Sequence, residues 1–166
     1  MLVRPARADE HVAVGELTVA GYDADGYLTL PDGTFDHEYG GWLVDAAPRG
    51  QADGLLVAVE EDELLGTVTW CPYGSPFAQL ATEPNQGELR TLSVAPHARR
   101  LGVGRALVAA CLDRARAEDL TEVVLCSLRE MLPAHRLYES FGFTRRPELD
   151  LEPLPGVDLW AFSLRI

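Results

Sequence analysis

The sequence predicts a mixed α/β protein with a central β-sheet. Three observations indicate this fold class. Apolar segments rich in β-branched residues, typical of strands, occur at 55–60, 64–71 and 88–94. Apolar residues at 103–117 recur at i, i+3, i+4 and i+7, which is the periodicity of an amphipathic helix. Another short apolar segment follows at 122–126, so the second half of the chain alternates strand, helix and strand.

Local signals predict the elements of the first half. A short strand within 2–7 is followed by two helices, at 9–22 and 36–47, in which apolar residues recur at helical spacing. The intervening segment 23–34 is rich in Asp, Gly and Pro, as loops are. The acidic turn at 61–63 joins the two neighbouring strand segments into a β-hairpin.

The second half contains one long loop and two further elements. Segment 72–86 holds three prolines and is longer than most connections, so we expect substrate contacts there. Pro133 suits the first turn of a helix that runs to Phe141 and ends at Gly142. The segment 158–166 alternates apolar and polar residues and predicts a last strand.

Length, charge and hydropathy limit the possible functions. At 166 residues the chain is expected to form one domain, residues 1–166, that buries its own core. A net charge of -12 argues against a nucleic-acid partner, because phosphate backbones are bound by clustered Lys and Arg. The segment 1–10 has no apolar signal core and no apolar run could cross a bilayer, so we expect a cytoplasmic protein without a membrane partner.

Cysteine and histidine usage indicates neither disulfides nor a metal site. The three cysteines form no even set and lack the spacing of metal ligands. The four histidines are scattered as well. We therefore expect reduced cysteines and no bound metal. The residues are Cys71, Cys111, Cys126, His11, His37, His97 and His135.

The most informative stretch is LSVAPHARRLGVGRAL, residues 92–107, where a strand passes through a turn into a helix. Gly102 and Gly104 lack a Cβ, so backbone N–H groups there can approach a ligand closely. A helix N-terminus adds unsatisfied N–H donors and a partial positive charge, both of which favour phosphate. The stretch predicts a pyrophosphate site, although a simple glycine-rich turn would have the same sequence. Leu107 stands where the dinucleotide-binding fingerprint requires Gly or Ala, so that fingerprint is excluded.

Two segments resemble the GNAT family of N-acetyltransferases. Arg99-Arg100-Leu101-Gly102-Val103-Gly104 matches the family signature R/Q-x-x-G-x-G/A, and the preceding residues 92–96 resemble its central strand. Residues 134–143 resemble the later segment A-x-x-L-Y-E-x-x-G-F. The resemblance implies a GNAT-type fold, with a mixed sheet of about six to seven strands flanked by about four helices.

The resemblance also implies acetyl-CoA as cosubstrate and indicates how it binds. Backbone amides of the loop would hold the CoA pyrophosphate, helped by the positive charge of the local arginines. Backbone groups of the strand before it would pair with the pantetheine arm like an additional strand. The implied cofactor-binding residues are Leu92, Val94, Arg99, Arg100, Leu101, Gly102, Val103, Gly104 and Arg105.

Acyl transfer from a thioester to an amine needs a proton acceptor for the amine and a proton donor for the departing thiolate. Tyr138 stands where the family has a tyrosine that protonates the CoA sulfur; the alternative is a ring that packs between helix and sheet. Glu88 begins the central strand, where relatives carry an acidic base; the alternative is an exposed carboxylate paired with Arg90. His135 is a weaker candidate base, for which a solvent-facing helix position is the simpler interpretation.

Three further positions bear on the mechanism that the resemblance implies. The backbone N–H of Val94 would meet the oxyanion if the strands separate there as in the family. Met131 stands where many relatives have Asn, so no Asn contact to the thiol is expected. Cys126 would allow an acyl-enzyme, but direct transfer with a buried cysteine is the expectation.

The resemblance therefore implies an acetyl-CoA-dependent N-acetyltransferase that acts by direct transfer on a primary amine of a small molecule or peptide, as a monomer or homodimer. A non-catalytic acyl-CoA sensor and a protein N-terminal acetyltransferase remain as alternatives. We expect the acceptor to contact segments 22–39 and 72–86, where aromatic and acidic residues could hold a cationic amine; scattered core and loop residues would give the same composition.

Overall fold

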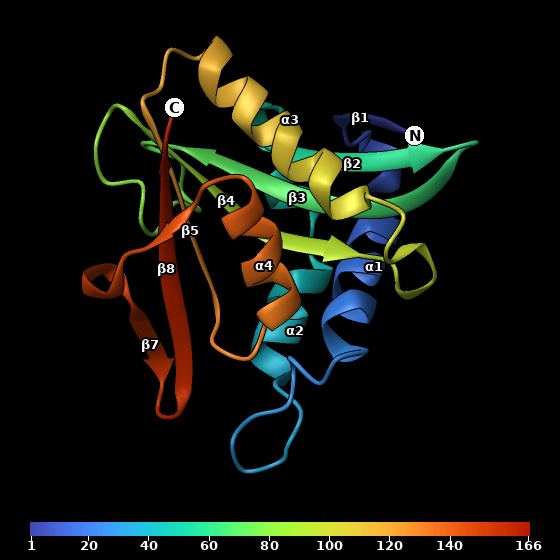
Figure 1. Cartoon of the computed structure of the whole chain (residues 1–166). Coiled ribbons are helices and arrows are strands. Elements are labelled where there is room, and N and C mark those ends of the chain that lie inside the picture. Colours follow the sequence, from blue (N-terminus) through green and yellow to red (C-terminus); the bar gives the residue numbers. More distant parts are fainter. The chain divides into compact units, whose positions relative to one another are not determined.

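The computed structural model describes all 166 residues and contains eight strands and four α-helices (Figure 1). The expected mixed α/β class is confirmed. The sheet has eight strands, one more than the six to seven expected. The strands are β1 (Leu2–Pro5), β2 (Leu55–Glu60), β3 (Glu63–Pro72), β4 (Gln86–Val94), β5 (Glu122–Leu128), β6 (Thr144–Arg145), β7 (Leu151–Leu154) and β8 (Val157–Arg165). The helices are α1 (His11–Asp23), α2 (His37–Val44), α3 (Val103–Ala117) and α4 (Leu132–Ser140).

The chain divides into two compact units. The first comprises Met1–Trp70 and Thr91–Ala110, and the second comprises Cys71–Arg90 and Cys111–Ile166. Both β4 and α3 run from one unit into the other. A single domain over residues 1–166 stays a prediction.

In the first unit, the turn between β2 and β3 has the backbone conformation that the right-handed twist of the two strands requires. β2 pairs antiparallel with both β1 and β3, and Glu60 pairs with Glu63 across the turn. Glu61 and Asp62 both have positive φ, 46° and 69°, as a two-residue turn with right-handed strand twist demands. The predicted hairpin is confirmed.

Helices cover both faces of this part of the sheet. Alternate residues of β2, among them Val57 and Val59, form one buried cluster with Val14 of α1. On the opposite face, Gly66 of β3 lies against α3: a Cβ at Gly66 would be 2.8 Å from Val103 Cγ1 and 3.1 Å from Leu107 Cδ1. The helix can therefore approach the sheet closely only because residue 66 has no side chain.

Helix α2 is capped at both ends by side chains. The Asp36 carboxylate accepts a hydrogen bond from the Tyr39 N–H at 2.8 Å, which satisfies one of the first-turn donors. At the other end the buried Arg49 guanidinium donates to the carbonyls of Trp42 (2.9 Å) and Leu43 (2.8 Å) and lies 4.9 Å from the centre of the Trp42 ring. A cation at a helix C-terminus is stabilised by the helix dipole.

In the second unit, β8 pairs antiparallel with β5, β6 and β7, and the start of β4 pairs parallel with β5. The elements predicted at 122–126, 133–141 and 158–166 are confirmed to within two residues as β5, α4 and β8. β6 and β7 were not predicted, because β6 has only two residues and β7 contains Pro153, which argues against a strand. No helix in the chain combines the length and the apolar character that a membrane span requires.

The contact between α1 and α2 predicts a large effect from a small substitution. A Cβ added at Gly15 would lie 1.9 Å from the backbone oxygen of Val44, so Gly15→Ala forces the two helices apart. We expect Gly15→Ala to lower the free energy of unfolding by about 2 kcal/mol or more. Gly41→Ala is the matched control: its Cβ would meet nothing within 4 Å, so alanine should stabilise α2 by roughly 0.5–1 kcal/mol. Urea denaturation of both variants measures the difference, and equal stability would show that the helices are packed otherwise.

Candidate active site

The turn between β4 and α3 presents backbone N–H groups without protein partners. Arg100 and Gly102 have φ of 65° and 83°, in the left-handed region, and a Cβ at Gly102 would meet nothing within 4 Å. Val103 and Gly104 occupy the first turn of α3, where N–H groups have no intrahelical acceptor, and neither donates elsewhere in the protein. The turn therefore has the donors and the open space that an anion requires.

The three arginines of this turn have different surroundings. The side chains of Arg100 and Arg105 are exposed. Arg99 is half-buried, and its guanidinium donates to Asp25 Oδ1 at 2.8 Å and to the Gly21 carbonyl at 3.0 Å. The predicted loop residues therefore lie together, but Arg99 has protein partners that its motif does not reveal.

The strand that leads into this turn is bent. Thr91 has φ of 52° within β4, a conformation that a β-branched residue adopts only when its surroundings enforce it. Its hydroxyl is 2.7 Å from that of Thr69 on β3. Leu92 and Val94 follow this bend and are half-buried. The parallel pairing of β4 with β5 ends earlier, at Glu88 and Val124.

Glu88 lies in the second unit and is fully buried. Its Oε2 accepts three backbone hydrogen bonds, from Gln79 (2.7 Å), Leu80 (2.7 Å) and Ala81 (3.2 Å). Its Oε1 has no hydrogen bond and lies 3.7 Å from Arg90 Nε. The alternative of an exposed carboxylate is therefore wrong, although the pairing with Arg90 is present.

The donors to Glu88 come from the loop between β3 and β4, which the sequence marked for substrate contacts. Arg90 Nη1 donates to the Phe77 carbonyl at 2.6 Å and fastens the same loop. The sequence could not predict these contacts, because a backbone N–H donor does not depend on the residue type. Glu88 and Arg90 together hold the loop residues 77–81 on the sheet.

Tyr138 is buried in the second unit and packs against aromatic rings. Its ring centre lies 6.0 Å from that of Phe143 and 6.1 Å from that of Phe162. Burial raises the pKa of its phenol far above the ordinary value. The phenol is thus protonated at neutral pH, and its O–H makes no hydrogen bond within the protein.

Strand register places Glu88 and Tyr138 on opposite faces of the sheet. Glu88 pairs with Val124 of β5, so its side chain shares a face with Val124. Phe162, which Tyr138 contacts, pairs with Leu125 and therefore lies on the other face. The two candidate catalytic residues consequently approach β5 from its two sides.

His135 does not face solvent, contrary to the interpretation from sequence. Only 5% of it is exposed, and its Nε2 lies 3.0 Å from the Leu128 carbonyl. Its ring is nearly parallel to that of Trp160, with centres 5.7 Å apart. Burial lowers the pKa of its imidazole. These contacts make His135 part of the packing between α4 and β8.

Cys126 is not a nucleophile at neutral pH. Burial first, and then the charge of Glu88, raises the pKa of its thiol to about 11. Its Sγ lies 3.9 Å from Gln79 Oε1, in the loop that Glu88 holds. Burial likewise raises the pKa of the Cys111 thiol to about 12. Both thiols therefore remain protonated, which supports direct transfer over an acyl-enzyme.

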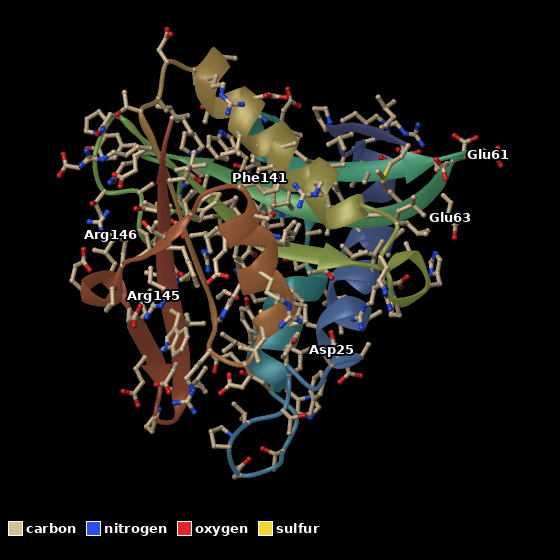
Figure 2. The ribbon with its side chains drawn as sticks, in the orientation of Figure 1. Asp25, Glu61, Glu63, Phe141, Arg145 and Arg146 are labelled. Atoms are coloured by element: carbon tan, nitrogen blue, oxygen red, sulfur yellow. The ribbon has the colours of Figure 1, made fainter.

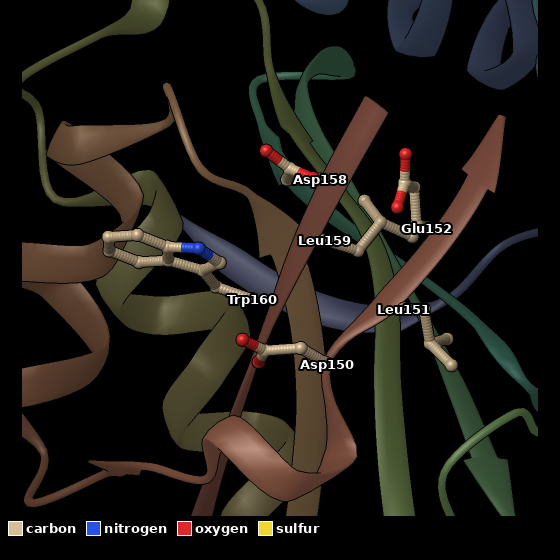
Figure 3. A pocket seen from close by; sticks show the side chains of 6 residues that line it. All are labelled: Asp150, Leu151, Glu152, Asp158, Leu159 and Trp160. Carbon is tan, nitrogen blue, oxygen red and sulfur yellow. The ribbon is translucent and has the colours of Figure 1, made fainter. Parts of the chain in front are cut away.

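A hollow of about 380 Å³ lies between β7 and β8 (Figure 3). It contains three carboxylates, but each already has a partner within the protein. Asp150 binds Arg145, Asp158 binds Arg129, and Glu152 accepts from the Gly156 N–H. None of the residues predicted from sequence lines it. Its lining residues are Asp150, Leu151, Glu152, Asp158, Leu159 and Trp160.

Comparison with known proteins gives consistent matches. Residues 22–143 match the model of the acetyltransferase (GNAT) family. The mycothiol acetyltransferase of Acidothermus cellulolyticus is 36% identical over 138 residues, which cover 74% of this chain and 42% of that protein. The N-acetylaspartate synthetase of Danio rerio is 35% identical over 101 residues, covering 61% and 33%. The chain thus spans less than half the length of these relatives.

Solved structures share the fold over the whole chain. A ribosomal-protein-alanine N-acetyltransferase from Brucella melitensis superposes with a TM-score of 0.70 at 20% identity and covers 100% of both chains. A paia N-acetyltransferase from Thermoplasma acidophilum in complex with coenzyme A gives 0.72 at 16% identity, covering 99% of this chain and 98% of that one. The GNAT-type fold that the sequence resemblance implied is confirmed.

The hydrogen bonds of Glu88 predict different outcomes for two substitutions. Glu88→Leu leaves three N–H groups without an acceptor, two of them in buried contacts, and should lower the free energy of unfolding by about 2 kcal/mol or more. Glu88→Gln keeps a carbonyl oxygen that can accept the same bonds and should lose much less. Chemical denaturation and hydrogen exchange at residues 79–81 measure both effects. Unchanged exchange in a folded Glu88→Leu protein would show that these N–H groups have another acceptor.

Proposed function

The chain belongs to the acetyltransferase (GNAT) family, and on this basis we propose that it transfers an acetyl group from acetyl-CoA directly to a primary amine. The turn at 99–104 is the observation that carries the proposal: its N–H donors lack protein partners and its glycine leaves open space. In this proposal the backbone of residues 99–105 holds the CoA pyrophosphate. Leu92 and Val94 pair through their main chains with the pantetheine arm.

Tyr138 has the proposed role of proton donor to the departing thiolate. Its raised pKa keeps the phenol protonated, and no internal hydrogen bond competes for the O–H. Because an ordinary thiol has a pKa near 8.5, complete transfer from so weak an acid is uphill. A hydrogen bond that strengthens as negative charge develops on sulfur is therefore the form of assistance that this environment favours.

Glu88 has the proposed role of proton acceptor for the amine. Its Oε2 is occupied by three N–H donors, so only Oε1 can accept a proton, directly or through water. A buried carboxylate oxygen without a donor is costly to leave unsatisfied, and an ammonium group or a water molecule would satisfy it. The backbone N–H of Val94 is the proposed donor to the oxyanion.

A small-molecule amine is the proposed acceptor class. Relatives above 30% identity bear the names mycothiol acetyltransferase and N-acetylaspartate synthetase, whereas the ribosomal-protein-alanine N-acetyltransferase is similar in fold at 20% identity. Tyr22 and Tyr39 of segment 22–39 have ring centres 6.2 Å apart, and Tyr39 stacks on Trp42, three residues beyond the segment, with centres 5.7 Å apart. Aromatic rings suit a cationic amine, and the same segment of the sequence contains Asp23, Asp25, Asp32 and Asp36.

Release of free CoA distinguishes this enzyme from a sensor that binds acyl-CoA without turnover. The protein is incubated with acetyl-CoA and a panel of small amines and peptides, and thiol release is followed. Turnover with small amines supports the proposal; turnover with peptides alone would assign an N-terminal acetyltransferase. Binding of acetyl-CoA without release across the panel would assign the sensor.

Gly102→Asp should abolish acetyl-CoA binding while the protein still folds. The substitution places a carboxylate and a Cβ where phosphate and backbone must meet, in a space that is otherwise open. Gly33→Asp is the matched control, because Gly33 also has positive φ, 84°, and no atom within 4 Å of its Cβ position. Calorimetric titration compares the two. Near-normal affinity in folded Gly102→Asp would mean that the pyrophosphate binds elsewhere.

Tyr138→Phe removes the hydroxyl and keeps the ring that packs against Phe143 and Phe162. We expect kcat to fall about a hundredfold, with little change in acetyl-CoA affinity or Tm, because only the proton donor is lost. The raised pKa further predicts that the wild-type rate shows no decline from phenol ionisation between pH 6 and 9. Unchanged kcat in Tyr138→Phe would leave the ring with a packing role alone.

A further inference from the structure

The end of helix α1 has one backbone carbonyl that a distant side chain satisfies. The last four carbonyls of a helix have no intrahelical partner. In α1 those of Ala20, Tyr22 and Asp23 accept from the N–H groups of residues 24, 27 and 26. The Gly21 carbonyl instead accepts from Arg99 Nη2 at 3.0 Å. Arg99 therefore provides the helix C-terminal contact that the local chain does not.

A second bond from Arg99 holds the turn that follows α1. Its Nη1 donates to Asp25 Oδ1 at 2.8 Å, and Asp25 lies just beyond the end of the helix (Figure 2). A carboxylate and a helix C-terminus both favour a cation, so one guanidinium joins two negative groups. Arg99 is also the first residue of the turn whose backbone is proposed to bind pyrophosphate.

Helix α1 is seated closely on the strand that enters the same turn. Ser93 Oγ donates to the Thr18 carbonyl at 3.2 Å. A Cβ at Gly21 would lie 2.1 Å from Ser93 Oγ and 3.0 Å from the Val94 carbonyl oxygen. The last turns of α1 thus contact β4 before the chain reaches Arg99, and the two segments form one hydrogen-bonded assembly.

The turn that Arg99 holds also places the first of a row of aromatic rings. The Tyr27 N–H donates to the Tyr22 carbonyl, and the two rings meet edge to face with centres 6.5 Å apart. Tyr22 in turn contacts Tyr39, which stacks on Trp42. Arg99 is therefore connected through the turn 24–29 to the segment where the acceptor is proposed to bind.

From these contacts we infer that Arg99 is a positioning residue that couples CoA binding to the order of the turn 24–29. The inference rests on the proposed function. CoA fixes the backbone of the loop, which fixes the Arg99 side chain and, through it, Asp25 and the Gly21 carbonyl. An ordered turn should bind the acceptor more tightly, so CoA binding raises the affinity for the acceptor. By linkage, acceptor binding at this turn raises the affinity for CoA by the same factor. Partly exposed ion pairs contribute little to global stability, so the contact can be removed without unfolding the protein.

Hydrogen exchange with coenzyme A alone tests the coupling without knowledge of the acceptor. In the wild-type protein, CoA should slow exchange at residues 100–106 and also at 24–29. Asp25→Ala and Arg99→Met should keep the protection at 100–106, because those contacts come from the backbone, and should lose it at 24–29. Asp23→Ala, two residues before Asp25, removes a carboxylate that makes no bond to Arg99 and should keep both. The Tm of each variant establishes that it is folded.

Three results would overturn the inference. Protection at 24–29 that persists in folded Asp25→Ala and Arg99→Met would show that the turn responds through another route. Protection confined to 100–106 in the wild type would show that no coupling exists, while leaving the proposed CoA loop intact. Absence of protection at 100–106 in the wild type would remove the proposed function together with the inference. If Arg99→Met does not fold, Asp25→Ala against Asp23→Ala decides the question.

Discussion

Backbone N–H and C=O groups at helix ends and in loops need hydrogen-bond partners, and side chains of this protein supply many of them. Where the chain leaves its regular elements, side chains from outside the element satisfy the backbone groups: Arg99 at the end of α1, Arg49 at the end of α2, and Glu88 at the loop residues 79–81. The turn at the start of α3 differs, because its N–H groups have no such partner. At this turn a ligand is expected to provide the missing acceptor.

The buried carboxylate of Glu88 also needs hydrogen-bond partners. A carboxylate removed from water is stable only when donors surround it, and Glu88 has three on one oxygen and Arg90 near the other. The two carboxylate oxygens of Glu88 therefore have different roles. Oε2 holds the loop residues 79–81 in place, and Oε1 remains for the proposed proton transfer. In the proposed mechanism, the residue that holds this loop is therefore also the proton acceptor.

The two residues with proposed catalytic roles, Glu88 and Tyr138, both lie in the second unit but come from different elements, β4 and α4. Register places them on opposite faces at β5, so the proposed base and proton donor approach from different sides. Raised thiol pKa values at Cys111 and Cys126 leave no competing nucleophile among the residues around Tyr138.

Local periodicity and turn chemistry are enough to predict the hairpin at 55–71, helix α3 over 103–117, and the glycine turn before it. The burial of Glu88 and His135, and the pairing of Arg99 with Asp25, 74 residues away, depend on contacts that form only when the chain folds. The spacing of apolar residues in a strand or helix shows which residues share a face, but not which part of the protein covers that face. The short strands β6 and β7 likewise exist only because β8 offers them an edge, so nothing within their own residues predicts them.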